Sequence, residues 1–454
     1  MFSISALLTQ PVLPFKSLVG EHYKATSTVH LDETWFADFL DARLIAQLRS
    51  EGIYPIKSTF PRMLSIIDQK RRYAVLLDAR YCHYQVLYLR QFGRRILEIA
   101  SHVNRVIKQE QRVPLPTEFY FDSIEYLCRL GMLFCAERLC NPLQANAGEV
   151  AWHVSMIVAN HSGSFTSSMP RDENDCALSV AADLVAIQTQ AKLEPLESIL
   201  LRYLLLHECG HLKFNGFAGT AASARAALAR ALQVLEQQQF AEGSHDLIFA
   251  LKAAMADPRC LEEIAADEFA INAILESIKP ESIDLRFFRD LMLVQLSALV
   301  SAVFFSHGDL EREQFISGAE IQNEGRLAFE PSARTEAALA LLITVAAEFL
   351  PKQRAEVGHS QAEVMDDLLE YKTHIVNGSR LIELGIRQAS FLRFFQFVRD
   401  SIIPGWRYGE AVAAAKEQPL RVQHSYFSVS TLVGLGWTPE ELGFTVGSTA
   451  PQSS

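Results

Sequence analysis

Two histidines four positions apart, His207 and His211, place the tightest demand on how this chain can fold. In an α-helix, residues i and i+4 lie one turn apart on the same face. Two imidazoles in this arrangement can bind one Zn²⁺ ion at about 2.0–2.1 Å from each ring nitrogen. Pro195 suits the first turn of such a helix, and no helix breaker precedes Gly210. We therefore predict a zinc-binding helix over residues 195–214.

Glu208 follows the first histidine and completes an HExxH motif. We expect it to point toward the open side of the metal, where it can take a proton from zinc-bound water whose pKa the metal has lowered. The alternative is a helix with two ordinary histidines in its core or on its surface. About 0.03 chance matches are expected for a chain with this histidine and glutamate content. This low expectation favours the metal site.

A second predicted helix supplies carboxylates for the same metal. Asp257 suits its N-cap and Pro258 its first position. A catalytic zinc usually has three protein ligands and one open position. Glu263 and Asp267 are four positions apart and share one helix face. We predict Glu263 as the third ligand and Asp267 as the acid that accepts the N–H of a ligating histidine and fixes its tautomer.

Two neighbouring acids, Glu262 and Glu268, lie about 100° around the helix from Glu263 and Asp267 respectively. We expect both to face solvent or a neighbouring basic residue. Only Glu263 shares its face with Asp267, so it is the preferred ligand.

Two further positions on the HExxH helix have structural interpretations. Cys209 lies about 200° around the helix from His207, so we expect it to pack in the core. Gly210 costs about 1 kcal/mol in helix propensity relative to alanine. This cost indicates that the helix bearing Glu263 approaches closely at this point.

Together the two motifs resemble a known family. HExxH followed by ExxADxxA is similar to the gluzincin metallopeptidases of the HtpX and CAAX prenyl-protease type, with Glu263, Ala266, Asp267 and Ala270 at the fixed positions. The resemblance covers two short helices. It implies a zincin-like catalytic unit in which Glu263 is the third zinc ligand and Asp267 supports the site from behind.

The chain also departs from that family. Members of the HtpX type are embedded in membranes and carry a later His-Pro…Arg segment that helps to close the site. The nearest segment here begins with Glu330-Pro331 and ends with Arg334, with glutamate in place of histidine. The resemblance therefore does not identify which residue of this chain would donate a hydrogen bond to the transition state. The candidates are His307, Arg334, Tyr371 and His374. Size class and solubility also suggest a likeness to the Lit-type phage-exclusion peptidases.

The expected function is that of a zinc metalloendopeptidase acting on a protein or peptide substrate. Zinc would polarise the scissile carbonyl, and Glu208 would activate water and then protonate the leaving amine. The main alternative is a non-catalytic zinc-binding or protein-interaction module on a peptidase-like fold. The intact Glu208 argues against that alternative. A third possibility is a membrane-associated peptidase docked through the apolar run 291–305.

Composition limits the possible partners and the cellular location of the protein. The chain has 454 residues, a net charge of −11 and seven cysteines without a CxxC pair. The acidic balance argues against general nucleic-acid binding, and the odd cysteine number favours reduced thiols and a cytoplasmic location. The apolar run 291–305 is shorter than the roughly 18–20 residues that span a bilayer. We expect it to form a buried core helix rather than a transmembrane one.

One segment is basic, although the chain as a whole is acidic. Residues 57–112 contain 12 Lys and Arg against 4 Asp and Glu. Such asymmetry can mark a docking face for an acidic partner. The alternative is a set of solvated helix faces, which is the common role of surface charge.

The expected architecture is a mostly helical α+β protein with three parts. Residues 1–144 form a helical N-terminal region, 145–350 a zincin-like metallopeptidase domain, and 351–454 a helical C-terminal region with a frayed tail. Within them we predict helical structure over 61–140, including 121–140, and over 221–240. A strand is predicted at 149–158, either internal or an exposed edge for substrate. Turns are predicted at Asn377-Gly378, Pro404-Gly405 and residues 434–436.

Overall fold

The structure is a computed structural model, and everything said of it below refers to the residues that it describes. These are residues 39–51, 53–58, 65–69, 72–109, 192–213, 218–237, 244–317, 330–353 and 360–386, with separate positions between 126 and 134 and between 180 and 187. The strand predicted at 149–158, the turns predicted at 404–405 and 434–436, and the C-terminal tail lie outside them.

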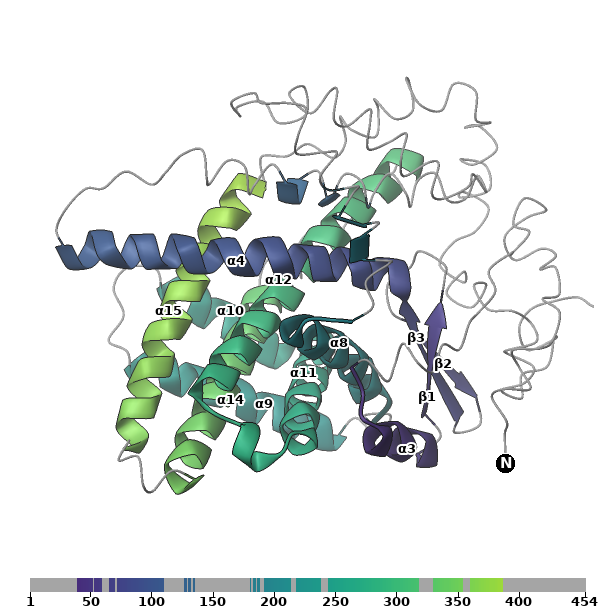
Figure 1. The fold of residues 1–454 in the computed structure, drawn as a ribbon, viewed down its shortest axis with the longest axis horizontal. Coiled ribbons are helices and arrows are strands. Elements are labelled where there is room, and N and C mark those ends of the chain that lie inside the picture. Colours follow the sequence, from purple (N-terminus) through teal and green to yellow (C-terminus); the bar gives the residue numbers. More distant parts are fainter. Residues whose placement is uncertain are drawn as a thin grey trace, which may run out of the picture.

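The described part of the chain is mostly helical, as the sequence predicts (Figure 1). Its α-helices are α3 (Ala42–Ser50), α4 (Ala79–Gln109), α8 (Pro195–Lys213), α9 (Ala218–Gln237), α10 (Ser244–Ala256), α11 (Pro258–Ser277), α12 (Leu285–Ser317), α14 (Glu330–Gln353) and α15 (Gln361–Ile386). A short 3₁₀ turn, η2 (Pro280–Ser282), precedes α12.

Local sequence signals set the starts of the two helices that matter most for the site. Helix α8 begins at Pro195, where the fixed φ of proline suits a first turn. Helix α11 begins at Pro258, and the side chain of Asp257 accepts hydrogen bonds from the backbone N–H groups of Arg259 and Cys260. Both predicted starts are confirmed.

A small sheet lies between α3 and α4 in the sequence. Strands β1 (Ile53–Ser58), β2 (Ser65–Gln69) and β3 (Arg72–Asp78) are ordered β1-β3-β2. Strand β1 runs parallel to the central β3, and β2 runs antiparallel to it. The helical prediction for 61–140 is therefore wrong over β2 and β3, and α4 starts only after them. Pro55 is tolerated because β1 is an edge strand.

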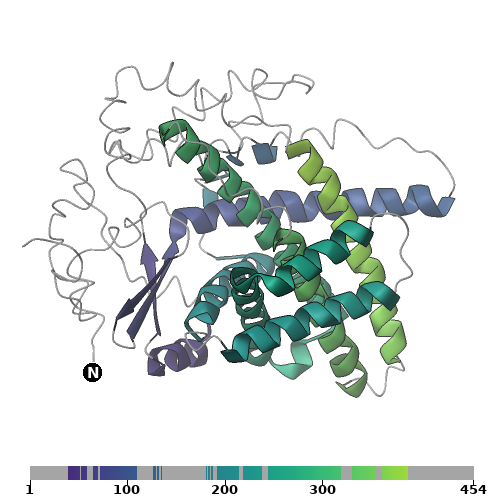
Figure 2. The ribbon, with the colours of Figure 1, turned by 180° about the vertical axis from the view of Figure 1, so that it is seen from behind.

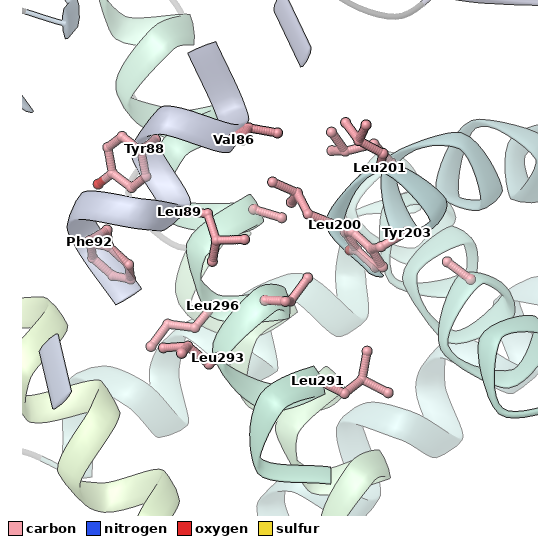
Figure 3. Packing of buried hydrophobic residues seen from close by; sticks show 14 of the residues in the cluster. Val86, Tyr88, Leu89, Phe92, Leu200, Leu201, Tyr203, Leu291, Leu293 and Leu296 are labelled. Atoms are coloured by element: carbon pink, nitrogen blue, oxygen red, sulfur yellow. The ribbon is translucent and has the colours of Figure 1, made fainter. Parts of the chain in front are cut away.

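The core forms where α4, α8 and α12 meet (Figure 3). Helix α4 lies across α12 and α15, and it supplies buried side chains such as Tyr88 and Phe92. Leu200 and Leu201 of α8 and Leu293 of α12 belong to the same cluster. A second cluster packs the alanine-rich α9 and α10 onto α11 and α14, best seen from behind (Figure 2).

Helix α12 contains the apolar run noted in the sequence. Its segment Leu285–Phe305 is long and apolar enough to cross a membrane by length and composition alone, and 67% of the window is buried inside the protein. The polar side chains of Gln295 and Ser301 are fully buried in it and form hydrogen bonds with Tyr203 and Gln85 respectively. These internal partners favour the interpretation as a core helix.

One predicted turn is instead the interior of a helix. Asn377 and Gly378 lie within α15. A Cβ on Gly378 would lie 2.9 Å from Cγ1 of Ile96, on α4. The glycine allows α15 and α4 to pack closely. In a sequence, an Asn-Gly pair indicates a turn and gives no sign of such a contact.

The basic segment 57–112 includes β2, β3 and α4. Arg90 forms an ion pair with Glu197 of α8, and Arg94 and Arg95 lie near Glu98 of their own helix. Several of these charges thus have partners within the chain. The acidic docking partner stays a prediction.

Candidate metal centre

Helices α8 and α11 approach unusually closely, and the glycine of the HExxH motif is the reason. A Cβ on Gly210 would lie 2.8 Å from the Cα of Ala266 and 3.1 Å from its carbonyl oxygen. Only a glycine in α8 next to a small residue in α11 allows this backbone contact. The predicted role of Gly210 is confirmed. Cys209 is fully buried in the core, also as predicted.

The close approach brings His207, His211 and Glu263 together. One ligand atom from each lies within 4.8 Å of the other two. The two Nε2 atoms are 3.2 Å apart. Nε2 of His207 is 3.4 Å from Oε2 of Glu263, and Nε2 of His211 is 3.8 Å from its Oε1. Ligands about 2.0–2.1 Å from a tetrahedral zinc would be separated by roughly 3.3–3.5 Å, so these spacings suit a zinc ion.

The outer ring nitrogens make a second set of contacts. Nδ1 of His207 lies 2.8 Å from Oδ1 of Asp267, the acid predicted to orient it. Nδ1 of His211 lies 3.1 Å from Oε1 of Glu262. The side chain of Glu262 is partly exposed to solvent, as expected, but its contact with a histidine of the motif was not predicted.

The other neighbouring acid lies where it was expected. Glu268 pairs with Arg230 of α9 at 2.6 Å and accepts a hydrogen bond from Ser223. This pairing removes Glu268 from the set of possible ligands and connects α11 to α9.

The donor atoms fit a cation. If each Nδ1 donates its proton to a carboxylate, each Nε2 carries a lone pair, and the two lone pairs converge on a point beside Glu263. Converging acceptors repel one another unless a proton or a metal ion lies between them. Two imidazoles and one carboxylate are also the ligand types that zinc prefers. His207, His211 and Glu263 would therefore be the residues that hold it.

Asp267 connects the cluster of His207, His211 and Glu263 to helix α12. Its side chain is almost fully buried. The hydroxyl of Tyr203, one turn before His207 on α8, donates to Oδ1 of Asp267 at 2.5 Å. Gln295 of α12 in turn donates to that hydroxyl at 2.7 Å. Tyr203 and Gln295 were not predicted to belong to the site. The i, i+4 spacing of Tyr203 and His207 is the one signal that could have found the tyrosine.

Arg334 of α14 completes the cluster. Its Nε and Nη2 donate to the two oxygens of Asp267 at 2.8 and 2.9 Å. Its Nη1 lies 2.8 Å from Oε2 of Glu263 and 3.6 Å from Oε1 of Glu330. Every guanidinium nitrogen thus has a carboxylate partner. The geometry suits a residue that positions the acids better than a donor to substrate.

Among the described side chains, no contact links Tyr371 or His374 to the cluster of His207, His211 and Glu263. The Tyr371 ring lies under Arg289, whose Cζ is 5.4 Å from the ring centroid. His374 follows on the same helix, α15. The side chain of His307 lies outside the described residues.

Neighbouring charges raise the pKa of one side chain in the cluster and lower the pKa of two others. Burial opposes the charged form of His207, but Asp267 and Glu263 outweigh it and raise its pKa to about 10. Burial likewise opposes ionisation of Asp267, but Arg334 and His207 lower its pKa to about 2. The pKa of Glu263 falls below its ordinary value for the same reason, chiefly through Arg334. Without a metal ion, the cluster therefore favours two ionised carboxylates and a proton on His207, and a zinc ion would replace that proton at Nε2.

Glu208 differs from these acids. Burial raises its pKa above the ordinary value, although the two histidines oppose the shift. A carboxylate with a raised pKa accepts a proton more readily, which suits a general base.

The chain matches no protein-family model, no curated protein and no solved structure.

Proposed function

We propose that the protein is a zinc-dependent metallopeptidase of the gluzincin type, with an α+β, zincin-like catalytic unit. The observation that carries the proposal is the convergence of His207, His211 and Glu263. Glu208 follows His207 directly in the sequence of α8. Asp267 lies behind His207, where an orienting acid is expected. A protein or peptide substrate, a cytoplasmic location and an acidic partner for residues 57–112 are parts of the same proposal.

The residues have distinct tasks in this reaction. His207, His211 and Glu263 would bind zinc, which when bound supplies a Lewis acid and a water of lowered pKa. Glu208 takes a proton from the attacking water and returns it to the leaving amine, so that water is added across one peptide bond. Asp267 keeps His207 in the tautomer whose Nε2 faces the metal. Arg334 holds Glu263 and Asp267 in place.

The substitution Glu208→Gln tests the proposal. Glutamine keeps the size and the carbonyl of glutamate but cannot take a proton. We expect unchanged zinc content and a rate lower by about 10²–10⁴-fold. The measurement compares new protein N-termini in the cell's own lysate after treatment with the native and variant proteins. A selective enzyme can ignore generic test substrates, which is why the lysate is used.

Glu268→Gln is the matched control, because the same chemical change there affects an acid that pairs with Arg230 away from the histidines. It should cleave as the native protein does. If the native protein binds zinc but yields no N-termini beyond those of Glu208→Gln, the peptidase proposal fails and the non-catalytic zinc module replaces it.

A further inference from the structure

Glu262 immediately precedes Glu263 on α11 and contacts the second histidine of the motif. Its Oε1 lies 3.1 Å from Nδ1 of His211. The other nitrogen of that ring, Nε2, lies 3.2 Å from Nε2 of His207. The ring is thus held between a carboxylate on its outer side and the metal cluster on its inner side.

His207 has the same arrangement, with Asp267 at its outer nitrogen. The two carboxylates differ in their surroundings. The side chain of Asp267 is 2% exposed, whereas that of Glu262 is 38% exposed. Water competes more strongly for Glu262, so we expect its effect on the metal to be weaker than that of Asp267.

We propose that Glu262 is a positioning residue for His211. It accepts the Nδ1–H of His211, which leaves the lone pair of Nε2 directed at the metal and limits rotation of the ring. The inference rests on the proposed zinc site and adds to it a carboxylate for each ligating histidine. Helix α11 then supplies three adjacent functions: one ligand, Glu263, and one orienting acid for each histidine.

The test compares Glu262→Ala, Glu262→Gln and Glu268→Ala. Glu268 is a suitable control because it lies on the same helix and has a polar partner that is not a histidine. Zn²⁺ affinity is measured by competition with a chromophoric chelator, and the geometry of the site by the visible spectrum after Co²⁺ is substituted for zinc. Folding of each variant is checked by thermal unfolding.

We expect Glu262→Ala to weaken Zn²⁺ binding about 10-fold, the lower end of the range for such partners, and to change the Co²⁺ spectrum. Glu262→Gln should recover most of the affinity, because its amide oxygen still accepts the Nδ1–H. Glu268→Ala should match the native protein in both measurements.

Native affinity and spectrum in Glu262→Ala would overturn this inference while leaving the zinc site intact. Equal losses in Glu262→Ala and Glu268→Ala would also overturn it, because the effect would then belong to the helix. A Gln variant as weak as the Ala variant would do the same, since no hydrogen-bond role would remain. The proposed function fails by a different result, namely a native protein that binds no Zn²⁺.

Discussion

Asp267 is the acid on which the contacts of the site converge. It accepts hydrogen bonds from Tyr203 and Arg334, and Nδ1 of His207 lies 2.8 Å from it. A buried carboxylate is stable only when its charge is balanced and its oxygens are hydrogen-bonded. Among the described side chains that contact it, Arg334 is the permanently charged cation. The arginine therefore decides whether Asp267 can remain ionised in the interior.

We predict that Arg334→Ala destabilises the protein by about 3–5 kcal/mol, the typical cost of removing one partner from a buried ion pair. Both Asp267 and Glu263 would lose their cation. Arg334→Lys should recover part of this loss, because lysine keeps the charge but cannot form the two parallel hydrogen bonds. Urea unfolding of the purified proteins gives the free energies.

Arg289→Ala provides the comparison, since Arg289 also forms two bonds to an aspartate, at 2.5 and 2.6 Å to Asp367. That pair is 38% and 36% exposed, so its loss should cost only about 0–1 kcal/mol. If the two alanine variants lost similar free energies of unfolding, burial would not explain the contribution of Arg334 to stability.

Residues with regular spacing could be predicted from the sequence, and the structure brings them together. His207 and His211 share one face of α8, and Glu263 and Asp267 share one face of α11, so helical periodicity was enough to group each pair. Arg334 was only one of four candidates for a different role. It is 67 positions from Asp267, and no local pattern indicates which distant side chain will reach a buried acid.

At the scale of elements, the contact between α8 and α11 determines the geometry of the site. Glu263 lies one turn before Ala266, the residue that Gly210 touches. Any increase in the distance between the helices there would move the carboxylate away from the histidines. The distance between the helices is therefore set by the absence of a side chain at Gly210.

We predict that Gly210→Ala destabilises the protein by about 1–3 kcal/mol, as overpacking of a core does, and weakens Zn²⁺ binding. In an ordinary helix the same change would stabilise by about 1 kcal/mol, because alanine is the better helix former. Here the new Cβ meets backbone rather than a movable side chain. Thermal unfolding and chelator competition measure the two effects.

Gly93→Ala in α4 is the control for helix propensity. A Cβ there would lie 3.4 Å from Cδ2 of Leu293, an ordinary contact. This variant should be as stable as the native protein or more stable. The explanation for Gly210 would be wrong if Gly210→Ala matched Gly93→Ala in stability and in affinity for Zn²⁺.

Helices with capping signals were easier to predict than short strands. Pro195 and Asp257-Pro258 mark helix starts through the chemistry of a few adjacent residues. Strands β2 and β3 have only five and seven residues, and short apolar runs do not separate strand from helix by periodicity. Gly378 was misread for a related reason, because its partner Ile96 is far away in the sequence.

At the scale of the whole molecule, the site joins parts of the chain that are far apart in sequence. The ligating residues come from α8 and α11, and Arg334 adds α14. Through Tyr203 and Gln295 the same network reaches α12 of the main core. A metal ion bound here would therefore stabilise the packing of several helices, and not only a local loop.

We predict that the purified protein contains about one zinc per chain and that removing it lowers the unfolding temperature. A ligand that binds only the folded state stabilises it by about 4 kcal/mol when present at a thousandfold excess over its Kd. For domains of 150–250 residues, each kcal/mol corresponds to about 2–4 °C, so we expect a decrease of several degrees on addition of a chelator.

His207→Ala should unfold at the same temperature with and without the chelator, because its metal site is lost. Glu208→Gln should show the full native shift, since Glu208 acts on water and is not needed to hold the metal. These two neighbouring substitutions in α8 therefore separate binding from chemistry by a measurement that needs no substrate. An equal chelator effect in the native protein and in His207→Ala would place the stabilising metal elsewhere. No effect in a native protein shown to contain zinc would mean that the metal does not hold α8 and α11 together.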